Sequence, residues 1–293
     1  PAHLLTQSWE EMIHDPSVQI IVEVMGLKEE SLNLILEALN CKKAVVTANK
    51  ALLAEYGAEI FEAATRNQTP VFYEASVGGG IPVIKCLREA LIGNHISSIH
   101  GIINGTSNYI LTRMTESELS FQEALEEAQS AGYAEPDPSF DINGWDAAHK
   151  AMILASLAYG FWIPKDQIFV EGIEQITAAD IRFARSLGYR IKLLGIIKAV
   201  EGDTRSSIEV RVHPTLIPEK HVLASVNHAF NAIAVHGDVV GEVLLYGRGA
   251  GQDPTSSAVL SDIAEAADAI HNPRRDLGFI PHSLYGTCKP VSY

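Results

Sequence analysis

The first 75 residues alternate between short β-rich stretches and longer helical patterns, and this alternation restricts the possible fold more than any other feature of the chain. The predicted strands cover residues 18–24, 43–47 and 69–74, and the helices between them cover residues 29–39 and 50–66. This βαβαβ order predicts a parallel sheet with right-handed crossovers. Ligands of such sheets bind beyond the carboxyl ends of the strands. Met25, Lys50 and Glu74 lie at or just after these ends, so we expect them beside a ligand.

The pattern changes after residue 75. Further β-rich stretches follow at residues 96–103, 190–200, 207–212, 230–235 and 241–246. They indicate a second sheet, mixed or antiparallel. A polar, turn-capable hexamer at residues 104–109 precedes a predicted helix over residues 109–115. We therefore expect an α/β chain with a parallel-sheet domain followed by an α+β domain with a mixed sheet.

Charge and composition argue against several classes of function. The 293-residue chain carries a formal net charge of −14, which disfavours nucleic acid or an anionic membrane as its partner. Its three cysteines, Cys41, Cys86 and Cys288, are far apart and odd in number. They suit a reducing compartment and give neither a disulfide framework nor a zinc pattern. With no apolar run near 18 residues and no signal-peptide pattern after Pro1, we expect a cytoplasmic protein whose beginning lies outside this sequence.

An acidic, proline-broken loop leads into an apolar helix in the middle of the chain. The loop and the start of the helix hold four carboxylates with no lysine or arginine inside the loop to pair with: Glu135, Asp137, Asp141 and Asp146. Lys150 follows Asp146 by four residues, on the same face of a helix that is apolar almost all round and is expected to be buried. Such a pair in isolation is most simply a structural ion pair. The three further acidic residues favour an active site.

Two glycine-rich stretches leave their roles open. Residues 77–82 follow the third predicted strand, and with Glu74 they offer the carboxylate and carbonyl oxygens that a hard cation binds, although a plain turn is the simpler interpretation. Residues 246–255 precede a predicted helix, whose first-turn amides can cradle an anion. Lys50 begins a helix, where a cation is unfavourable unless an anion lies beside it. It is therefore either a solvated lysine or a ligand contact.

Six motifs follow one another along the chain. They are Thr-Ala-Asn-Lys-Ala-Leu-Leu-Ala at residues 47–54, Glu-Ala-Ser-Val-Gly-Gly-Gly-Ile-Pro at 74–82, Asn-Gly-Thr-Ser-Asn-Tyr-Ile at 104–110, Gly-Tyr-Ala-Glu-Pro-Asp-Pro at 132–138, Gly-Trp-Asp-Ala-Ala-His-Lys at 144–150 and Gly-Ala-Gly-Gln-Asp-Pro-Thr at 249–255. From about residue 4 to residue 271 the chain resembles the homoserine dehydrogenase family in these motifs. That family interconverts L-aspartate 4-semialdehyde and L-homoserine with NAD(P)H, in threonine, methionine and isoleucine biosynthesis.

The resemblance implies a role for each polar residue around the acidic loop. Lys150 is implied to donate a proton to the aldehyde oxygen during reduction and to act as the base in the reverse reaction. Asp146 would bind the reacting end of the substrate and orient Lys150. Glu135 would bind homoserine through its α-ammonium group, with Asp141 as a supporting substrate contact. Lys50 matches a lysine at the junction of cofactor and substrate, where its charge can meet the substrate carboxylate or the cofactor.

The resemblance also implies ligands and partners. The cofactor is NADP or NAD, and its implied contacts are Met25, Lys50 and Gly251. A monovalent cation, usually sodium, is implied at Glu74 and the carbonyl groups of Val77, Gly79 and Ile81. The implied assembly is a homodimer, with no nucleic acid and no membrane as partner.

Two features depart from the family pattern. The strand and Gly-x-Gly-x-x-Gly turn that hold the cofactor pyrophosphate are not found before the first helix, and the tail after residue 272 is too short for a regulatory module. We expect an incomplete, partial Rossmann-like nucleotide-binding domain (1–75), a catalytic and dimerisation domain (76–250), and a returning helix with a tail (251–293). Two alternatives remain: another nicotinamide oxidoreductase of the same build, and a truncated, catalytically impaired subunit acting only in dimerisation.

Overall fold

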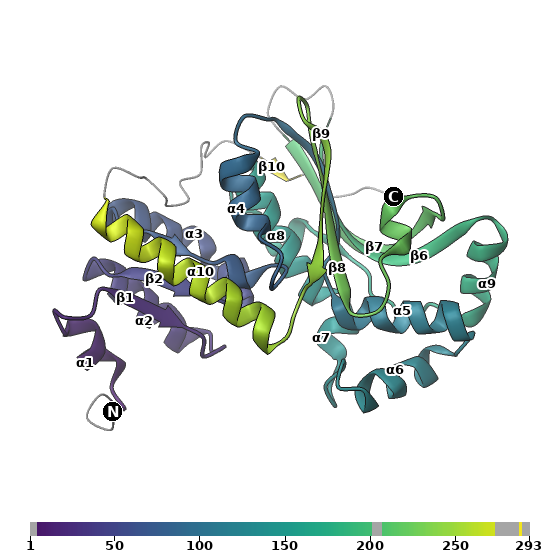
Figure 1. Cartoon of the computed structure of the whole chain (residues 1–293), viewed down its shortest axis with the longest axis horizontal. Helices are drawn as coiled ribbons and strands as arrows, with labels where there is room; N and C mark the ends of the chain where they lie inside the picture. Colours follow the sequence, from purple (N-terminus) through teal and green to yellow (C-terminus); the bar gives the residue numbers. More distant parts are fainter. Residues whose placement is uncertain (1–4, 201–206, 273–286, 289–293) are drawn as a thin grey trace.

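The computed structural model describes residues 5–200 and 207–272, together with the backbone of residues 287–288. At one end of the molecule, β1 (Ile20–Glu23), β2 (Ala44–Thr47) and β3 (Val71–Phe72) form a sheet in that order (Figure 1). Both neighbouring pairs are parallel, with Ile20 opposite Ala44 and Val45 opposite Val71. The predicted parallel sheet is therefore confirmed.

Helices cover both faces of this first sheet. α2 (Glu29–Asn40) and α3 (Lys50–Asn67) lie on one face, and α10 (Gln252–His271) returns from the end of the chain to cover the other (Figure 1). Because successive strand residues point to opposite faces, a strand covered on both sides is apolar throughout. All residues of β2 are accordingly buried. The short α1 (Trp9–His14) precedes the sheet and packs beside α2.

The second sheet has seven strands among the described residues, in the order β10-β7-β6-β4-β8-β9 with β5 also beside β7. Their bounds are β4 (Ile96–Ile102), β5 (Phe169–Val170), β6 (Tyr189–Ala199), β7 (Ser207–Pro218), β8 (Phe230–Gly237), β9 (Gly241–Arg248) and β10 (Thr287–Cys288). The pairs from β7 to β9 are antiparallel, whereas β5 and β10 join β7 in parallel. The predicted mixed sheet is confirmed. β7 extends beyond its predicted end at residue 212 because β6 pairs with it along its length.

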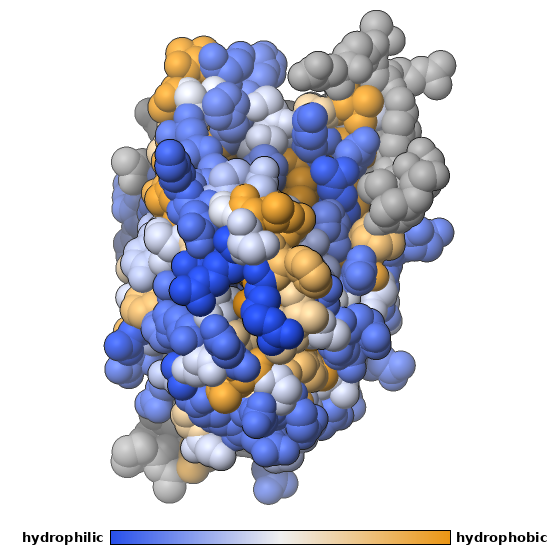
Figure 2. Space-filling model, turned by 90° about the vertical axis from the view of Figure 1, so that its right-hand side faces the viewer, coloured by the Kyte–Doolittle hydropathy of each residue, from blue (hydrophilic) through white to orange (hydrophobic). Residues whose placement is uncertain are grey.

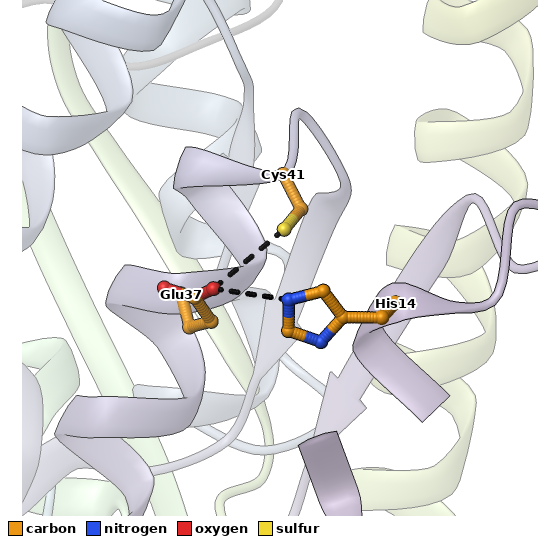
Figure 3. Close-up of side chains that lie close together, drawn as sticks. All are labelled: His14, Glu37 and Cys41. Carbon is orange, nitrogen blue, oxygen red and sulfur yellow. Dashed lines mark hydrogen bonds and ion pairs between the residues drawn. The ribbon is translucent and has the colours of Figure 1, made fainter. Parts of the chain in front are cut away.

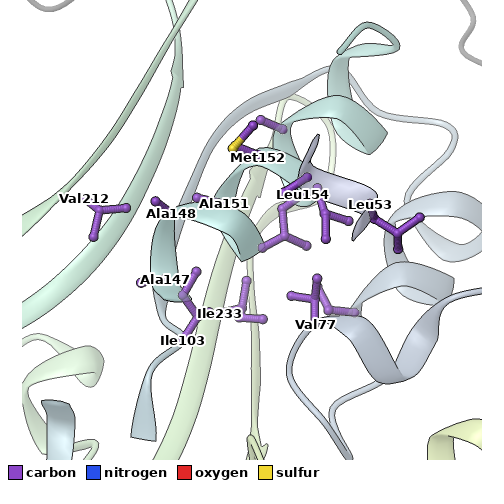
Figure 4. Packing of buried hydrophobic residues seen from close by; sticks show 14 of the residues in the cluster. Leu53, Val77, Ile103, Ala147, Ala148, Ala151, Met152, Leu154, Val212 and Ile233 are labelled. Atoms are coloured by element: carbon purple, nitrogen blue, oxygen red, sulfur yellow. The ribbon is translucent and has the colours of Figure 1, made fainter. Parts of the chain in front are cut away.

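α8 (Trp145–Tyr159) is the buried helix that the sequence predicts, with every residue from Asp146 to Ser156 buried. Figure 4 shows it between the second sheet, represented by Val212 and Ile233, and Leu53 of α3. Alanines lie on the sheet side of the helix, where their small side chains allow a close approach. α8 thereby joins the hydrophobic cores of the two halves of the molecule.

Further helices surround the second sheet. They are α5 (Gly105–Ser117), α6 (Phe121–Ser130), α7 (Ser139–Ile142) and α9 (Ala178–Ser186), with shorter helical segments α4 (Val83–Lys85), η2 (Glu74–Ser76), η3 (Cys86–Ala90), η4 (Lys165–Gln167) and η5 (Val222–Ser225). The hexamer expected as a turn before residue 109 is instead the cap and first turn of α5. Asn104 is the N-cap, and its side chain accepts the N–H of Ser107. This strong cap outweighs the low helix propensity of the glycine, threonine and serine that follow.

The two glycine-rich stretches, far apart in sequence, pack against each other. The N–H of Gly80 donates to the carbonyl of Arg248 at 3.1 Å. A Cβ atom on Gly79 would lie 2.6 Å from the carbonyl oxygen of Gly249, and Gly79 also has a φ of +54°. Only glycine satisfies both conditions without strain. This contact connects the end of the first sheet to the chain segment that enters α10.

The surface on the side of α9 is mostly hydrophilic, with smaller hydrophobic patches between the polar residues (Figure 2). On α9 itself, Phe183 and Leu187 at its C-cap are exposed. Within the described residues, no helix is both long enough and apolar enough to cross a membrane.

Candidate active site

Lys150 and Asp146 form a buried pair on α8, and their side chains are the centre of the site. Lys150 Nζ donates to Asp146 Oδ2 at 2.7 Å and to the carbonyl oxygen of Ile103 at 2.8 Å. Only 8% of Lys150 and 4% of Asp146 is exposed. An ammonium group has three donors, so one N–H of Lys150 is left without an acceptor among the described residues. The pair is therefore fixed in position, and Lys150 can still donate one hydrogen bond.

Lys50 reaches the same carboxylate from the nucleotide-binding half. It begins α3, and its Nζ lies 3.3 Å from Asp146 Oδ1. Burial would raise the pKa of Asp146, but the charges of Lys150 and Lys50 outweigh it and hold the pKa below its usual value. Asp146 is thus an ionised carboxylate between two ammonium groups. Lys50 therefore pairs with a buried carboxylate rather than being fully solvated.

Asn104 completes the site, and sequence reasoning missed it. Its Nδ2 donates to Asp141 Oδ1 at 2.7 Å and to Asp146 Oδ2 at 2.8 Å. Its Oδ1 accepts the N–H of Ser107, which fixes the orientation of the amide. The sequence held two signals: Asn104 begins one of the six motifs, and asparagine is a preferred N-cap residue. One side chain therefore caps α5 and holds two carboxylates together.

The acidic loop is only partly gathered at this centre. Asp141 is half-buried, and burial together with the charge of Asp146 raises its pKa. Glu135 is exposed, and its carboxylate has no partner among the described residues. The expectation that all four carboxylates converge is wrong for Asp137, whose Oδ1 accepts the N–H and hydroxyl of Ser139. Local Asp–Ser turn formation takes this carboxylate away from the site.

His149 is the neighbouring titratable group on α8. Burial and the charge of Lys165 lower its pKa to about 4, so the imidazole is neutral near pH 7.

The end of β1 offers a second contact surface. Met25 is 47% exposed, and its N–H donates to Glu23 Oε1 at 2.9 Å. Glu23 is itself buried and also accepts from the hydroxyls of Ser31 and Thr47. This fully bonded carboxylate, which sequence reasoning also missed, fixes the turn that presents Met25. Its role is to shape the ligand-facing edge of the sheet.

Gly251 lies at the start of α10, where the helix meets the Gly78–Gly80 turn. It has a φ of +116° and a ψ of 160°, a conformation that only glycine adopts easily. Gln252 and Asp253 offer N–H groups at this helix start, whereas Pro254 has none and the N–H of Thr255 donates to the Gly251 carbonyl. The positive end of the helix favours an anionic group, although the Asp253 carboxylate already lies in its first turn.

Glu74 is buried at the beginning of α4. Its Oε1 accepts the N–H of Ile84 at 2.9 Å and its Oε2 that of Lys85 at 2.8 Å. Burial raises its pKa despite these bonds, so a nearby cation would stabilise its ionised form. Among the described residues the carbonyls of Val77 and Gly79 accept no hydrogen bond, whereas that of Ile81 accepts one from Val83. The carbonyl groups of Val77 and Gly79 are thus oxygen donors of the kind that a hard cation binds, whereas the Ile81 carbonyl and both Glu74 oxygens already accept backbone N–H groups.

Family models match both halves of the chain. The model described as homoserine dehydrogenase covers residues 82–264, and the homoserine dehydrogenase NAD-binding domain covers residues 1–74. A homoserine dehydrogenase of Synechocystis sp. is 48% identical over 99% of this chain and 68% of its own length. One of Helicobacter pylori is 50% identical over 90% of this chain and 61% of its own. The chain thus spans roughly two thirds of these longer relatives.

Solved structures agree with these matches. A homoserine dehydrogenase from Thiobacillus denitrificans superposes with a TM-score of 0.87 at 47% identity, covering 96% of this chain and 64% of the other. A hyperthermophilic archaeal homoserine dehydrogenase in complex with NADPH has a TM-score of 0.76 at 32% identity, covering 90% and 76%.

A parallel-sheet domain that matches a NAD-binding family model, joined to a mixed-sheet domain, places the chain in the class of two-domain nicotinamide-nucleotide-binding proteins. Within that class, the matches over nearly the whole chain decide the family. The chain belongs to the homoserine dehydrogenase family.

Proposed function

We propose that this chain catalyses the reversible, NAD(P)H-dependent reduction of L-aspartate 4-semialdehyde to L-homoserine. One observation carries the proposal. Lys150 Nζ donates to the carbonyl of Ile103 and to Asp146, which leaves one N–H free. Lys50, from the nucleotide-binding half, contacts the same Asp146 carboxylate. A proton donor held beside a cofactor domain is what carbonyl reduction requires. We found no observation that favours an idle, dimerisation-only subunit.

Lys150 moves the proton. In the reduction its free N–H donates to the aldehyde oxygen, which becomes the hydroxyl of homoserine, and in the reverse direction the neutral amine accepts that proton. Bound NADP or NAD supplies or accepts the hydride at the carbon atom. The ionised Asp146 holds Nζ in place and stabilises the ammonium form from which the proton leaves.

Asn104 and Asp141 keep Asp146 in position. Because the amide bonds both carboxylates, Asp146 cannot rotate away from Lys150 without breaking a second hydrogen bond. A side chain locked by its neighbours holds a catalytic group in the productive geometry.

Glu135 and Lys50 recognise the charged end of the substrate. The unpaired Glu135 carboxylate suits the α-ammonium group, and the half-exposed Lys50 suits the α-carboxylate or a cofactor phosphate. An aldehyde without the amino group would leave Glu135 unpaired. The site is therefore selective for an amino-acid aldehyde.

Met25, Lys50 and Gly251 hold the cofactor. Gly251 brings the amides of α10 close to a phosphate group, and Met25 packs against an apolar part of the nucleotide. NADPH is named with the archaeal relative, and either NADP or NAD fits these contacts.

Glu74 binds sodium together with the carbonyls of Val77, Gly79 and Ile81. We expect a higher thermal unfolding temperature in NaCl than in an equal concentration of N-methylglucamine chloride. Glu74→Gln should remove the difference. An equal temperature for the native chain in both salts would contradict the cation site.

The chain acts as a cytoplasmic homodimer in amino-acid biosynthesis. Among the described residues Cys41 and Cys86 are free thiols, which suits a reducing compartment. β9 is an edge strand of the second sheet, and its exposed Tyr246 offers an apolar contact for a second copy. The domains divide at residues 75 and 250, since the first sheet ends at Phe72 and α10 returns to it after Gly251.

The test follows the absorbance of NADPH with L-aspartate 4-semialdehyde and, as a control, with succinate semialdehyde, which lacks the amino group. We expect turnover of the amino-acid aldehyde alone and a raised KM for it in Glu135→Gln. Equal turnover of both aldehydes would refute the substrate assignment. No turnover at any concentration of NADPH or of NADH would refute the activity.

A further inference from the structure

A second group of chemically active side chains lies outside this site, where α1 meets the end of α2. His14 comes from the last turn of α1, Glu37 from α2, and Cys41 is the C-cap of α2. Figure 3 shows the three side chains pointing toward one another. Their ligand atoms lie within 4.8 Å of one another, and no other such group of three occurs among the described residues. We propose that His14, Glu37 and Cys41 bind one Zn²⁺ ion.

The distances are close to those of a tetrahedral zinc site. Zinc bonds of about 2.0–2.3 Å to nitrogen, oxygen and sulfur place neighbouring ligand atoms ~3.4–3.6 Å apart. His14 Nε2 lies 3.4 Å from Glu37 Oε1, and Cys41 Sγ lies 3.8 Å from the same oxygen. The third pair, His14 Nε2 and Cys41 Sγ, lies within 4.8 Å, so side-chain rotation would bring all three atoms to one ion. The exposed imidazole leaves the fourth position open to water.

The tautomer of His14 supports a metal at its other ring nitrogen. Nδ1 lies 2.8 Å from the carbonyl oxygen of Glu10, and because a carbonyl only accepts, Nδ1 must be the donor. In the neutral imidazole Nε2 then directs a lone pair at the Glu37 carboxylate. Two acceptors then face each other, and the contact becomes favourable with a cation between them, either a metal ion or the proton of an imidazolium. An Nδ1–H bonded to a backbone carbonyl is also the usual outer support of a metal-binding histidine.

The electrostatic surroundings of Cys41 favour a bound cation. Cys41 ends α2, where the last carbonyls carry the negative end of the helix dipole. In the metal-free chain the Cys41 thiol donates to Glu37 Oε1 at 3.8 Å. Zinc binding then forms an S–Zn bond and releases the thiol proton to solvent, without any change of oxidation state. The donor set of nitrogen, carboxylate oxygen and sulfur selects zinc over magnesium or calcium.

The bound ion would join α1 and α2, which pack against each other and are already in contact through His14 and Glu37. Glu37 and Cys41 are four residues apart, on one face at the end of α2. His14 belongs to α1, and β1 lies between α1 and α2 in the sequence. The sequence shows no zinc motif because this histidine reaches the pair only through the fold. The site is independent of the proposed reaction, since no substrate or cofactor contact takes part.

The test uses the full chain after removal of metal with EDTA. We expect one Zn²⁺ per chain in competition with a chromophoric chelator, and a sulfur-to-cobalt charge-transfer band when Co²⁺ is bound instead. Cys41→Ser and His14→Ala should weaken zinc binding by about 100-fold or more. Loss of a direct ligand should cost more than loss of a residue that only supports a ligand, which costs roughly 10–100-fold. Cys86→Ser removes the other described free thiol and should bind as the native chain does.

Thermal unfolding gives a second readout that does not depend on colour. Zinc at saturating concentration should raise the unfolding temperature of the native chain and of Cys86→Ser, and should leave Cys41→Ser unchanged. Absence of binding by the native chain overturns the proposal. Equal zinc affinity in Cys41→Ser and the native chain overturns it as well.

Discussion

Asn104 performs two functions through one amide group, and substitutions can separate them. Its Oδ1 caps α5, and its Nδ2 bonds Asp141 and Asp146. Asn104→Ala removes both. Loss of an N-cap costs about 1 kcal/mol of the free energy of unfolding, and loss of a hydrogen bond to a charged group costs roughly 1.5–3 kcal/mol.

The second part of the estimate is set by burial. Asp146 keeps its two lysine partners, and Asp141 is half open to water, so the two lost bonds cost about as much as one fully buried bond. We therefore expect Asn104→Ala to lower the free energy of unfolding by ~3 kcal/mol, the sum of about 1 for the cap and about 2 for the bridge.

Asn104→Ser is the matched control. Serine is as good an N-cap as asparagine, but a single hydroxyl cannot bridge two carboxylates. We expect a loss of ~2 kcal/mol, with a difference of ~1 kcal/mol between the two variants. Urea unfolding followed by tryptophan fluorescence measures both, since Trp145 stands next to Asp146. A serine variant as stable as the native chain would show that the bridge contributes nothing; two equally unstable variants would disprove the cap.

Three further predictions concern other parts of the molecule. Burial raises the pKa of Asp262 to about 7. The folded chain therefore keeps a proton that the unfolded chain releases, so stability falls from about pH 4 to pH 7, by on the order of 4 kcal/mol. Asp262→Asn should flatten this dependence in urea titrations, and an unchanged slope would refute the cause. Gly251→Ala, at a φ of +116°, should raise the KM for NADPH more than the KM for the aldehyde. If the variant and the native chain had the same KM for NADPH, the proposed contact of Gly251 with the cofactor would be excluded. Gly57→Ala would place Cβ 2.3 Å from the Trp162 ring and should cost about 1–3 kcal/mol of stability, measured by the urea midpoint.

Local patterns in the sequence predicted most of the fold. The alternation of the first 75 residues gave the parallel sheet, because strand and helix periods are properties of neighbouring residues. The apolar run after Gly144 gave the buried α8 for the same reason. The spacing of Asp146 and Lys150 gave their ion pair, since residues four apart on a helix lie on one face.

Contacts between distant segments were beyond sequence reasoning. Asn104 lies 37 residues before Asp141, and nothing in either segment indicates that they meet. The packing of Gly79 against Gly249 depends on α10 returning to the first sheet. Asp137 was wrongly expected at the site because it lies in the acidic loop. Its carboxylate instead accepts the N–H of Ser139, two residues later.

The most direct test of Lys150 as the proton donor is kcat for aldehyde reduction in Lys150→Ala, with and without added methylamine. Cofactor binding, followed by NADPH fluorescence, should be unchanged, because Lys150 lies on α8 and is not among the proposed cofactor contacts Met25, Lys50 and Gly251. We expect kcat to fall by roughly 10²-fold or more, and part of it to return with the amine, which replaces the missing proton donor. A variant that keeps native kcat would contradict the role of Lys150.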